Sequence, residues 1–458
     1  FQPSSNTDTG LARYVLDSTL TANAGGPYTI TEGDSLTLSA TASGGDGGPF
    51  TYSWDVNGGG RFVDATGSNP TLTWSQLEAL YPPINNGPAT FQVSVRASDS
   101  HGEYVVSAPV TLTLNDALPT ASVSGPAGNE VVGQPQAFTL SATDPSPVDT
   151  AAGFSFVVDW GDGSAQQTVT AAEAASPVSH VFTKAGSFTV DAWAVDKDGD
   201  KSATPATFTA VVNGAVEMQG GTLVVSGNNI VLQPADANGG ISVTVDGIAQ
   251  GVFYPTTQIV VYGLPGGDIV QLESARIRHH EVDITVPAVV FGGDGGDTID
   301  ARGSSANNVL VGGSGDDVLY GGHGRNLLIG GGGADTLSGG NGDDILIGGA
   351  TDYGSNLAAL DAIMAEWGRT DISYRQRIAD LEGTASGGLN GPYLLNATTV
   401  HDDGASDELV GGGGRDWYFA SADDVVIYKN HHEVDTDHRD AQADRHGSSW
   451  ARSDWDLR

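Results

Sequence analysis

Between Gly292 and Gly349 the chain repeats a nine-residue pattern, and this period restricts the possible folds more than any other feature. The repeat is G-G-x-G-x-D-x-U-x, with U a large apolar residue, in the copies GGDGGDTID, GGSGDDVLY, GGHGRNLLI, GGGGADTLS and GGNGDDILI. Six glycine-rich residues predict a turn, because glycine permits positive φ and close backbone approach. The next three residues predict a very short strand, so two repeats complete one coil of a parallel β-roll.

Most of these repeats carry an aspartate at their sixth position, and stacked coils place such aspartates one above another. Bare carboxylates in a row repel unless a hard cation lies between them. Ligands that are all oxygen suit Ca²⁺. The U residues are expected to point into the narrow space between the two sheets of the roll: Ile299, Leu310, Leu319, Leu328, Leu337 and Leu346.

The period and the apolar position together resemble the RTX (repeats-in-toxin) nonapeptide of secreted bacterial proteins. A glycine-rich linker would show neither feature. The resemblance implies a secreted calcium-binding protein, like the large surface proteins of environmental bacteria that carry such repeats. It also implies an uncleaved C-terminal export signal, for which the polar tail at 420–458 lies in the right place.

The degenerate stretch ARGSSANNVLV at 301–311 counts as the second repeat, and the period returns in DDGASDELV at 402–410 and GGGGRDWYF at 411–419. Two repeats make one coil, so repeats of the same parity stack on the same side. If a helical insertion lies within the seventh repeat, the odd row holds Asp297, Asp317, Asp335 and Asp407, and the even row holds Asn308, Asn326, Asp344 and Asp416. Amide oxygens bring no charge, so the odd row should bind Ca²⁺ well and the even row poorly until Asp344 meets Asp416. The further carboxylates on these turns would mainly raise the local charge: Asp294, Asp316 and Asp343.

This arrangement predicts that calcium couples folding to location. Without the ion, stacked carboxylates and the conformational entropy of glycine should leave the roll unfolded. Millimolar extracellular Ca²⁺ binds only the folded state and shifts the equilibrium toward it. A chain of this kind can therefore be exported unfolded and fold outside the cell.

The composition narrows the class of protein. The 458 residues carry a net charge of −37, which argues against nucleic acid and anionic membranes as partners. There is no cysteine, so calcium takes over the role of disulfides in an extracellular chain. No apolar run approaches the ~18 residues of a membrane span. The sequence opens with Phe1 and shows no signal peptide, which indicates processing or a piece of something longer.

Two β-rich regions precede the repeats. Residues 22–116 alternate in period two, and AGGPYTITEGDSLTLSA, YSWDVNGGGRFVDATG and VSVRASDSHGEY resemble PKD domains, which are immunoglobulin-like sandwiches. Trp54 is the expected core tryptophan. Residues 117–213 resemble a second copy through FSFVVDWGDGS and HVFTKAGSFTVDAWAVDKDGDKS. Its D-x-D-x-D run at 196–200 suits a Ca²⁺ clasp, but a tight solvated turn explains it as well and is favoured.

The remaining regions surround the repeats. Residues 214–291 are strand-rich and predict a parallel β-solenoid that runs into the roll at 292–349 and covers its first coil, with GLPGGDIVQ at 263–271 as a diverged nonapeptide. Residues 350–401 form a helical insertion, whose apolar Leu357, Leu360, Ile363, Met364 and Trp367 indicate a helical pair packing onto the roll. The nine-residue period returns at 402–419. The expected class is therefore all-β: two sandwiches, then a solenoid and β-roll with a small helical insertion.

Both ends of the chain hold features with two interpretations. Residues 1–21 form an N-terminal arm in which residues 11–20 suit a strand. This strand pairs within the chain or adds to a neighbouring molecule, which would produce fibres. The tail motif HHEVDTDH at 431–438 suits a transition metal, although a solvated tail is favoured.

No motif of an active site is found, since the sequence lacks G-x-S-x-G, H-E-x-x-H and a P-loop. The expected function is a secreted, non-enzymatic, calcium-stabilised structural or adhesive protein of the cell surface or extracellular matrix. Its partners would be calcium, surface or matrix polysaccharide, and further copies of itself. The alternatives are the accessory region of a larger extracellular hydrolase, or a β-solenoid polysaccharide lyase. For a lyase, the basic residues available are Arg276, Arg278, His279 and His280.

Overall fold

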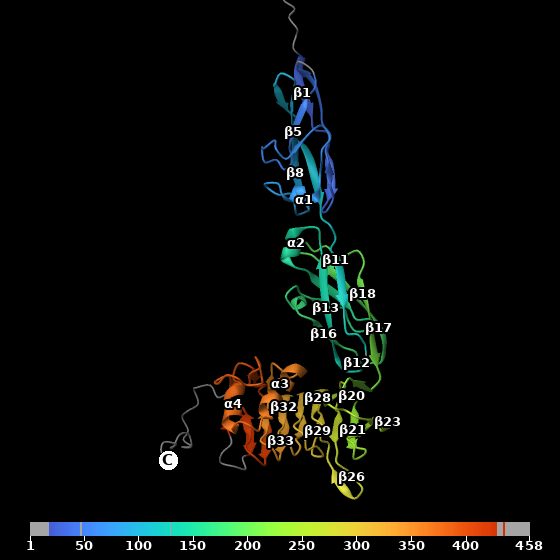
Figure 1. Ribbon diagram of the computed structural model, residues 1–458, viewed down its shortest axis with the longest axis vertical. Coiled ribbons are helices and arrows are strands. Elements are labelled where there is room, and N and C mark those ends of the chain that lie inside the picture. Colours follow the sequence, from blue (N-terminus) through green and yellow to red (C-terminus); the bar gives the residue numbers. More distant parts are fainter. Residues whose placement is uncertain (1–17, 46–47, 129, 428–433, 436–458) are drawn as a thin grey trace, which may run out of the picture. The chain divides into compact units, whose positions relative to one another are not determined.

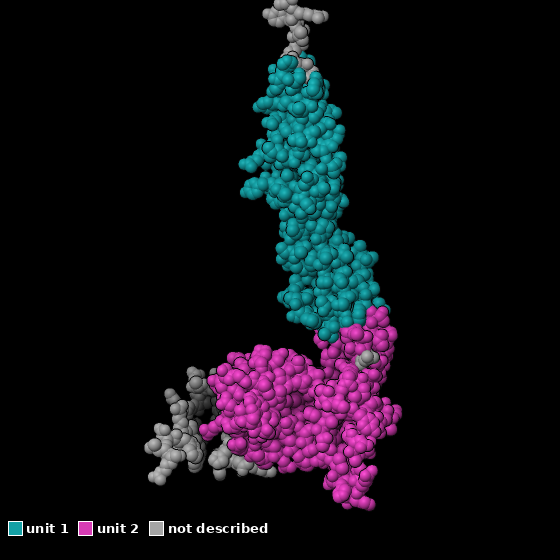
Figure 2. Space-filling model, in the orientation of Figure 1, with its two compact units in different colours: residues 1–125, 137–178, 189–208 teal, residues 126–136, 179–188, 209–458 magenta. Residues whose placement is uncertain are grey.

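The computed structural model describes residues 18–45, 48–128, 130–427 and 434–435. The chain forms two compact units (Figure 2). Unit 1 holds residues 1–125, 137–178 and 189–208, and unit 2 holds residues 126–136, 179–188 and 209–458. Residues 11–17 of the N-terminal arm and most of the histidine-rich tail motif lie outside the described residues. None of the helices in the described ranges is long and apolar enough to cross a membrane.

The first sandwich follows from period-two alternation, which places one face of each strand in the core. Its main sheet has the strand order β2 (Tyr28–Thr31), β10 (Val110–Asn115), β8 (Ala89–Ser98), β5 (Thr51–Asp55) and β6 (Ala65–Thr66), and β9 (Tyr104–Val106) also pairs with β8. Two smaller pairs are β1 (Ser18–Asn23) with β4 (Thr41–Gly45) and β3 (Leu36–Thr37) with β7 (Thr71–Leu72). Trp54 is fully buried in this core, as predicted.

The first strand begins at Ser18, earlier than the domain boundary expected at residue 22. β1 is antiparallel to β4, with Thr21 opposite Ser43. Residues 18–20 therefore pair within their own sandwich, because an unpaired strand edge in water is unfavourable. That part of the arm is not the free strand that addition to a neighbouring molecule would need.

The second sandwich has a three-stranded and a five-stranded sheet, and the boundary between the two units runs through its strands. The sheet orders are β11 (Thr120–Ser124), β13 (Pro135–Thr143), β16 (Val178–Val181), and β12 (Glu130–Val131), β18 (Ala206–Asn213), β17 (Gly186–Val195), β14 (Ser155–Asp159), β15 (Gln167–Val169). Three short helical segments were not expected from the sequence: α1 (Trp74–Glu78), α2 (Pro147–Ala152) and η1 (Glu173–Ala175). They are too short to show a 3.6-residue period.

The solenoid and roll in unit 2 consist of two nine-stranded sheets (Figure 1). Sheet A is β19 (Val216–Gln219), β20 (Thr222–Ser226), β24 (Gln258–Tyr262), β28 (Ala288–Asp294), β30 (Val309–Ser314), β32 (Leu327–Gly332), β34 (Ile345–Ile347), β38 (Trp417–Phe419) and β40 (Val434–Asp435). Sheet B is β23 (Ile248–Phe253), β22 (Ile241–Val245), β21 (Asn229–Pro234), β25 (Ile269–Leu272), β29 (Thr298–Asp300), β31 (Val318–Tyr320), β33 (Thr336–Gly340), β37 (Glu408–Gly412) and β39 (Val425–Ile427).

Strand direction distinguishes the start of the solenoid from the rest. From β20 and β21 onward, neighbouring strands within each sheet are parallel, as the solenoid prediction requires. The first coil is bordered by antiparallel strands instead, namely β19 beside β20 and the β22–β23 hairpin beside β21. These strands pair with the open end of both sheets and so act as its cap.

The roll has an inner and an outer apolar layer. All the predicted U residues are fully buried in one cluster between the sheets. The outer face of sheet A is also apolar and packs in a second cluster with the helices α3 (Leu357–Trp367) and α4 (Tyr374–Glu382). Asn356 and Ser373 cap the two helix N-termini, and Gly383, with φ of 79°, ends α4. The short antiparallel pair β35 (Ala350–Thr351) and β36 (Val400–His401) closes the base of this insertion.

Candidate calcium site

The odd-numbered repeats form a continuous row of aspartates. In each step the backbone N–H of one aspartate donates to Oδ1 of the aspartate in the next coil. The N···O distances are 2.7 Å from Asp297 to Asp317, 2.8 Å from Asp317 to Asp335, and 2.8 Å from Asp335 to Asp407. These four residues lie at equivalent positions because β29, β31, β33 and β37 are parallel and in register.

The even-numbered repeats form a second row of the same kind. Asn308 N–H donates to Asn326 Oδ1 at 3.2 Å, and Asn326 N–H donates to Asp344 Oδ1 at 2.6 Å. Asp344 N–H then donates to Asp416 Oδ1 at 2.9 Å. The structure thus brings together every residue named from the sequence, in two rows with the membership that the parity argument assigns.

The helical insertion lies inside the turn of the seventh repeat. A Cβ built on Gly330, the first glycine of its repeat, would lie 2.2 Å from Asp335 Oδ2. A Cβ on Gly348 would lie 2.3 Å from Asp407 Oδ2, which is the same relation across the insertion. Gly348 is therefore the first glycine of the seventh repeat, and the chain leaves the roll after it and returns before Asp407.

Two aspartates extend the odd row beyond the residues named from the sequence. Asp268 N–H donates to Asp297 Oδ1 at 2.7 Å, and Asp407 N–H donates to Asp424 Oδ1 at 2.9 Å. Asp268 occupies the sixth position of the diverged nonapeptide at 263–271. Asp424 is followed two residues later by Val426, which packs against the core, so it keeps the D-x-U part of the pattern. Both positions were recognisable from spacing alone.

The electrostatics of the rows favour a bound cation. Oδ2 of Asp297, Asp317, Asp335 and Asp344 is buried and accepts no hydrogen bond from the described part of the chain. Burial, with the charges of neighbouring aspartates, raises the pKa of Asp317 to about 7 and that of Asp335 to about 8. Burial also raises the pKa of Asp344 well above its usual value. A cation beside these oxygens would restore the charged form and offset the cost of burying it.

The space beside each free oxygen fits an oxygen-coordinated ion. A Cβ on Gly312 would lie 2.2 Å from Asp317 Oδ2 and 2.7 Å from the carbonyl oxygen of Gly330 in the next coil. The Cβ of Gly330 would likewise lie 2.3 Å from the Gly348 carbonyl oxygen. Only glycine leaves this space between carboxylate and carbonyl oxygens open. The donors are all hard oxygens, which suits Ca²⁺.

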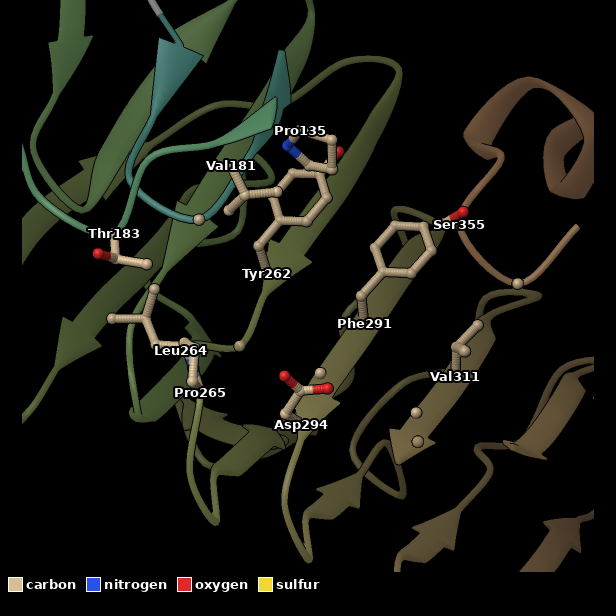
Figure 3. A pocket seen from close by; sticks show the side chains of 16 residues that line it. Pro135, Val181, Thr183, Tyr262, Leu264, Pro265, Phe291, Asp294, Val311 and Ser355 are labelled. Carbon is tan, nitrogen blue, oxygen red and sulfur yellow. The ribbon is translucent and has the colours of Figure 1, made fainter. Parts of the chain in front are cut away.

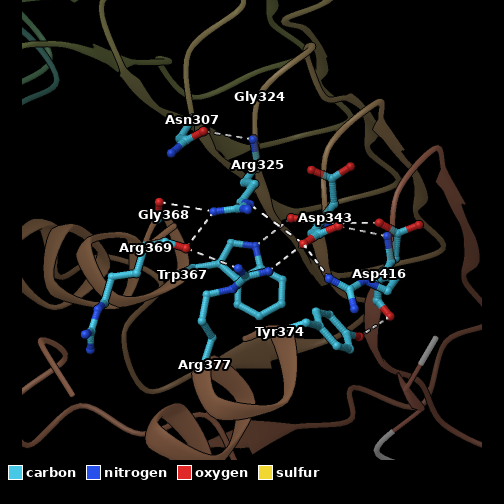
Figure 4. Close-up of polar contacts among 12 residues, drawn as sticks. Asn307, Gly324, Arg325, Asp343, Trp367, Gly368, Arg369, Tyr374, Arg377 and Asp416 are labelled. Atoms are coloured by element: carbon cyan, nitrogen blue, oxygen red, sulfur yellow. Dashed lines mark hydrogen bonds and ion pairs between the residues drawn. The ribbon is translucent and has the colours of Figure 1, made fainter. Parts of the chain in front are cut away.

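The additional carboxylates on the turns have structural partners, and their charges also help to raise the pKa of the row aspartates Asp297, Asp317 and Asp344. Asp294 accepts from Ser314 Oγ at 2.9 Å, and Asp316 Oδ1 accepts from Ala334 N–H at 2.9 Å. Asp343 lies among three arginines (Figure 4). Its Oδ2 is 2.5 Å from Arg377 Nη2, 3.8 Å from Arg325 Nε and 3.9 Å from Arg415 Nη2.

These arginines attach the helical insertion to the roll. Arg377 is buried on α4, and its guanidinium lies 4.8 Å from the ring centroid of Trp367. Trp367 Nε1 donates to the Asp343 carbonyl at 2.7 Å, and Tyr374 Oη donates to the Asp416 carbonyl at 2.7 Å (Figure 4). The insertion therefore contacts the turns that carry the even row, consistent with a packing role.

The basic residues that a lyase would need lie on a hairpin. β26 (Ala275–Ile277) and β27 (His280–Val282) are joined by a two-residue turn in which Arg278 and His279 have φ of 49° and 73°. Arg276 and His280 are exposed, as are the two turn residues. The cluster thus lies on an exposed hairpin, where Arg276 and His279 line a pocket of about 440 Å³ together with Glu281.

A pocket of about 360 Å³ lies beside the first coils of the roll (Figure 3). Its lining is mainly apolar and includes Tyr262 and Phe291, whose rings stack with centroids 5.3 Å apart and planes 7° apart. Asp294 is at its rim (Figure 3). The apolar part of this lining fits an apolar contact, and residues of the odd-row turns complete it: Gly293, Asp294, Gly312 and Gly313.

Comparison with known proteins identifies the repeats. The family model for the RTX calcium-binding nonapeptide repeat, which spans four copies of the repeat, matches at residues 302–337, 324–352 and 397–427. A comparison with curated proteins found no match.

Several solved structures show weak likeness to the chain. The fibronectin(III)-like modules of Clostridium thermocellum CbhA share 16% identity over 44% of this chain and 98% of that one, with a TM-score of 0.19. The D00-D0 domain of intimin shares 12% identity over 43% of this chain and 100% of that one, with a TM-score of 0.21. A solved chain from a 1.5-MDa bacterial ice-binding adhesin shares 16% identity over 49% of this chain and 74% of the solved chain, with a TM-score of 0.18. TM-scores this far below 0.5 are too low to relate the chain to any of these proteins.

The family match names calcium, and the two rows offer the oxygen-rich turns that such an ion requires. The nonapeptide region of this chain is a set of RTX calcium-binding repeats.

Proposed function

We propose that this chain is a secreted, non-enzymatic, calcium-stabilised structural or adhesive protein of the cell surface or extracellular matrix. The observation that carries the proposal is the pair of buried rows, in which aspartate oxygens face glycine carbonyls of the next coil. The proposed ligands are Asp297, Asp317, Asp335 and Asp407 in the odd row, and Asp344 and Asp416 in the even row. Asn326 and Asn308, predicted as weaker ligands, instead turn their amide nitrogens toward main-chain carbonyl oxygens and continue the ladder.

Calcium would determine where this protein folds. In the calcium-free chain, ordering the roll means burying several carboxylates that repel one another. Ca²⁺ binds the ordered coils and not the extended chain, so its binding free energy becomes folding free energy. Extracellular calcium is high and cytosolic calcium is low, which makes this dependence useful to an exported protein. The net charge of −37 is consistent with surroundings rich in divalent cations.

The two sandwiches would serve as spacers or interaction modules. Their buried tryptophans, Trp54 and Trp160, form ordinary sandwich cores. The lyase alternative would have to use the basic hairpin at 275–282, where Arg276 and His279 line a pocket with Glu281. We assign the aspartates of the two rows to ion binding and not to acid–base catalysis.

The proposal is tested by circular dichroism of a fragment covering residues 214–458. Millimolar Ca²⁺ should increase its β signal, whereas the same concentration of Mg²⁺ should not, because Mg²⁺ demands regular octahedral geometry. The full chain treated in parallel controls for effects of truncation. A fragment and full chain that keep an equally folded roll in chelator would overturn the proposal.

A further inference from the structure

Outside the roll, acidic side chains from both sandwiches converge within unit 1. One carboxylate oxygen from each of Glu32, Asp116 and Asp149 lies within 4.8 Å of the others, and the same holds for Asp116, Asp196 and Asp200. Asp116 belongs to both groups. It lies between β10 of the first sandwich and β11 of the second.

Each member of this junction cluster (Glu32, Asp116, Asp149, Asp196 and Asp200) is held by backbone structure. Glu32 follows β2, donates its N–H to the Asn115 carbonyl, and accepts from Ala117 N–H at Oε2. Asp149 lies on α2, and Asp196 and Asp200 lie in the turn between β17 and β18. The cluster thus joins a loop of the first sandwich, the connecting segment, and two elements of the second.

The cluster contains buried oxygens that lack donors. Asp196 is only 6% exposed, and its Oδ1 accepts from the N–H groups of Asp198, Gly199 and Asp200, each at 2.9 Å. The D-x-D-x-D run therefore forms the tight turn favoured by the sequence. Asp196 Oδ2, however, is buried with no hydrogen-bond partner in the described ranges, and both oxygens of Asp116 are in the same situation.

Asp149 adds a fully buried carboxylate. It has one nearby cation, because Lys197 Nζ lies 3.1 Å from Asp149 Oδ1. Lys197 also pairs with Asp198 outside the cluster. Its single positive charge cannot neutralise the whole cluster, and Asp149 Oδ2 accepts no hydrogen bond from the residues described.

The excess negative charge is energetically unfavourable without a cation. Burial, together with the nearby Glu32, Asp196 and Asp200, raises the pKa of Asp116 to about 8. Burial also raises the pKa of Asp144, which lies next to the cluster and has a further buried oxygen without a donor in the described structure. Like charges held this close in a partly dry site require a proton or a metal ion between them.

We propose that the junction cluster is a second type of Ca²⁺ site, centred on Asp116 and separate from the RTX repeats. The ligands are all oxygen and come from irregular loops, which Ca²⁺ tolerates better than Mg²⁺ does. Zn²⁺ would favour nitrogen or sulfur ligands. An ion bound here links the connecting segment to both sandwiches and restricts motion between them. The site does not depend on the proposed function of the roll.

Hydrogen–deuterium exchange of the full chain tests the site, because it reports locally while the roll serves as an internal reference. Adding Ca²⁺ should slow exchange in segments 28–34, 112–119, 144–150 and 195–202. Where exchange occurs by local opening that releases the ion, Ca²⁺ should slow the exchange rate by a factor of about 1 + [Ca²⁺]/Kd. At a Ca²⁺ concentration 100 times the Kd, this slowing is ~100-fold. Mg²⁺ at equal concentration should slow it much less. No Ca²⁺-dependent change in these segments, or an equal effect of Mg²⁺, would overturn the proposal.

Two variants separate ion binding from a purely structural role. Asp116→Asn should abolish the Ca²⁺ effect in the junction segments while leaving it intact in residues 292–347. In chelator the same variant should exchange no faster than the wild type, because it removes repulsion. Glu103→Gln, an exposed change elsewhere in the first sandwich, should behave like the wild type. If Asp116→Asn keeps the Ca²⁺ effect, or loosens the junction already in chelator, the site is not as proposed.

Discussion

A reciprocal pair of substitutions, Asp335→Asn and Asn326→Asp, tests the electrostatic account of the two rows. Asp335 is 2% exposed, and burial with neighbouring aspartates raises its pKa from 3.8 to about 8. Because the pKa is raised in the folded state, the calcium-free fold loses stability as pH rises from about 4 to about 8. At ~1.4 kcal/mol per pKa unit, the penalty at pH 7 is at most ~4 kcal/mol.

Asparagine at position 335 would remove this penalty and keep the ladder, since Asn326 shows that an amide oxygen accepts the same backbone hydrogen bond. In chelator, Asp335→Asn should therefore raise the free energy of unfolding of the roll. Its gain in stability on adding saturating Ca²⁺ should be smaller than that of the wild type. A ~100-fold weaker site loses about 2.3 kcal/mol of calcium-linked stabilisation at 100 times the wild-type Kd.

Asn326→Asp should change both quantities in the opposite direction, the free energy of unfolding in chelator and the gain in stability on adding Ca²⁺. The Asn326 amide nitrogen donates to the carbonyl oxygens of Gly324 and Gly339 and to Asp344 Oδ1, at 2.9, 3.1 and 3.0 Å. A carboxylate loses these bonds and repels Asp344, so the calcium-free roll should be destabilised by ~1–3 kcal/mol or more. Added Ca²⁺ should then stabilise this variant more than it stabilises the wild type.

Thermal unfolding of the full chain at pH 7, in chelator and in Ca²⁺, measures both effects. Asp352→Asn, an exposed change at the base of the insertion, is the control and should alter neither condition by more than ~0.5 kcal/mol. The reasoning is refuted if the two substitutions shift stability in the same direction in chelator, or if both leave the calcium-induced shift unchanged.

Three further substitutions test packing. Gly330→Ala should prevent the roll from folding in Ca²⁺, because the added Cβ would lie 2.2 Å from a carboxylate oxygen. The control Gly214→Ala places its Cβ in open space and should fold like the wild type. Near-UV circular dichroism compares the two variants. Arg377→Met should cost about 3 kcal/mol by leaving Asp343 with only the two more distant arginines. Faster hydrogen exchange in residues 357–382 but not in residues 292–300 would show that the loss of stability is confined to the insertion. Equally faster exchange in both segments would contradict the prediction. Leu337→Ala should cost ~2–5 kcal/mol in chemical denaturation, and a loss below 1 kcal/mol would exclude a packed inner core.

The sequence alone determined the roll and both rows of candidate ligands. A nine-residue period is local, and each repeat meets the equivalent repeat of the next coil. The pattern therefore specifies contacts that are distant in sequence as well as near ones. For this reason the period, with the insertion assigned to the seventh repeat, pairs Asp335 with Asp407 across a 72-residue separation and places Leu337 in the core.

Only the tertiary structure decided which face of the roll the insertion covers. In even repeats the residues on both sides of U are apolar, as in Val309 and Val311, and they pack with the helices. In odd repeats the same positions hold residues such as Thr336 and Ser338. This contrast is present in the sequence, but the nine-residue pattern leaves these positions unspecified. The attachment of Asp343 to Arg377 likewise depends on how a helix lies against a turn.

No sequence pattern predicts the junction cluster. Glu32, Asp116, Asp149 and Asp196 come from four separate segments and share no period. Each has an ordinary local explanation as a loop, connector, helix or turn residue. Their convergence arises from the packing of the two sandwiches around the connecting segment, because side chains distant in sequence meet only where tertiary structure places their backbones together.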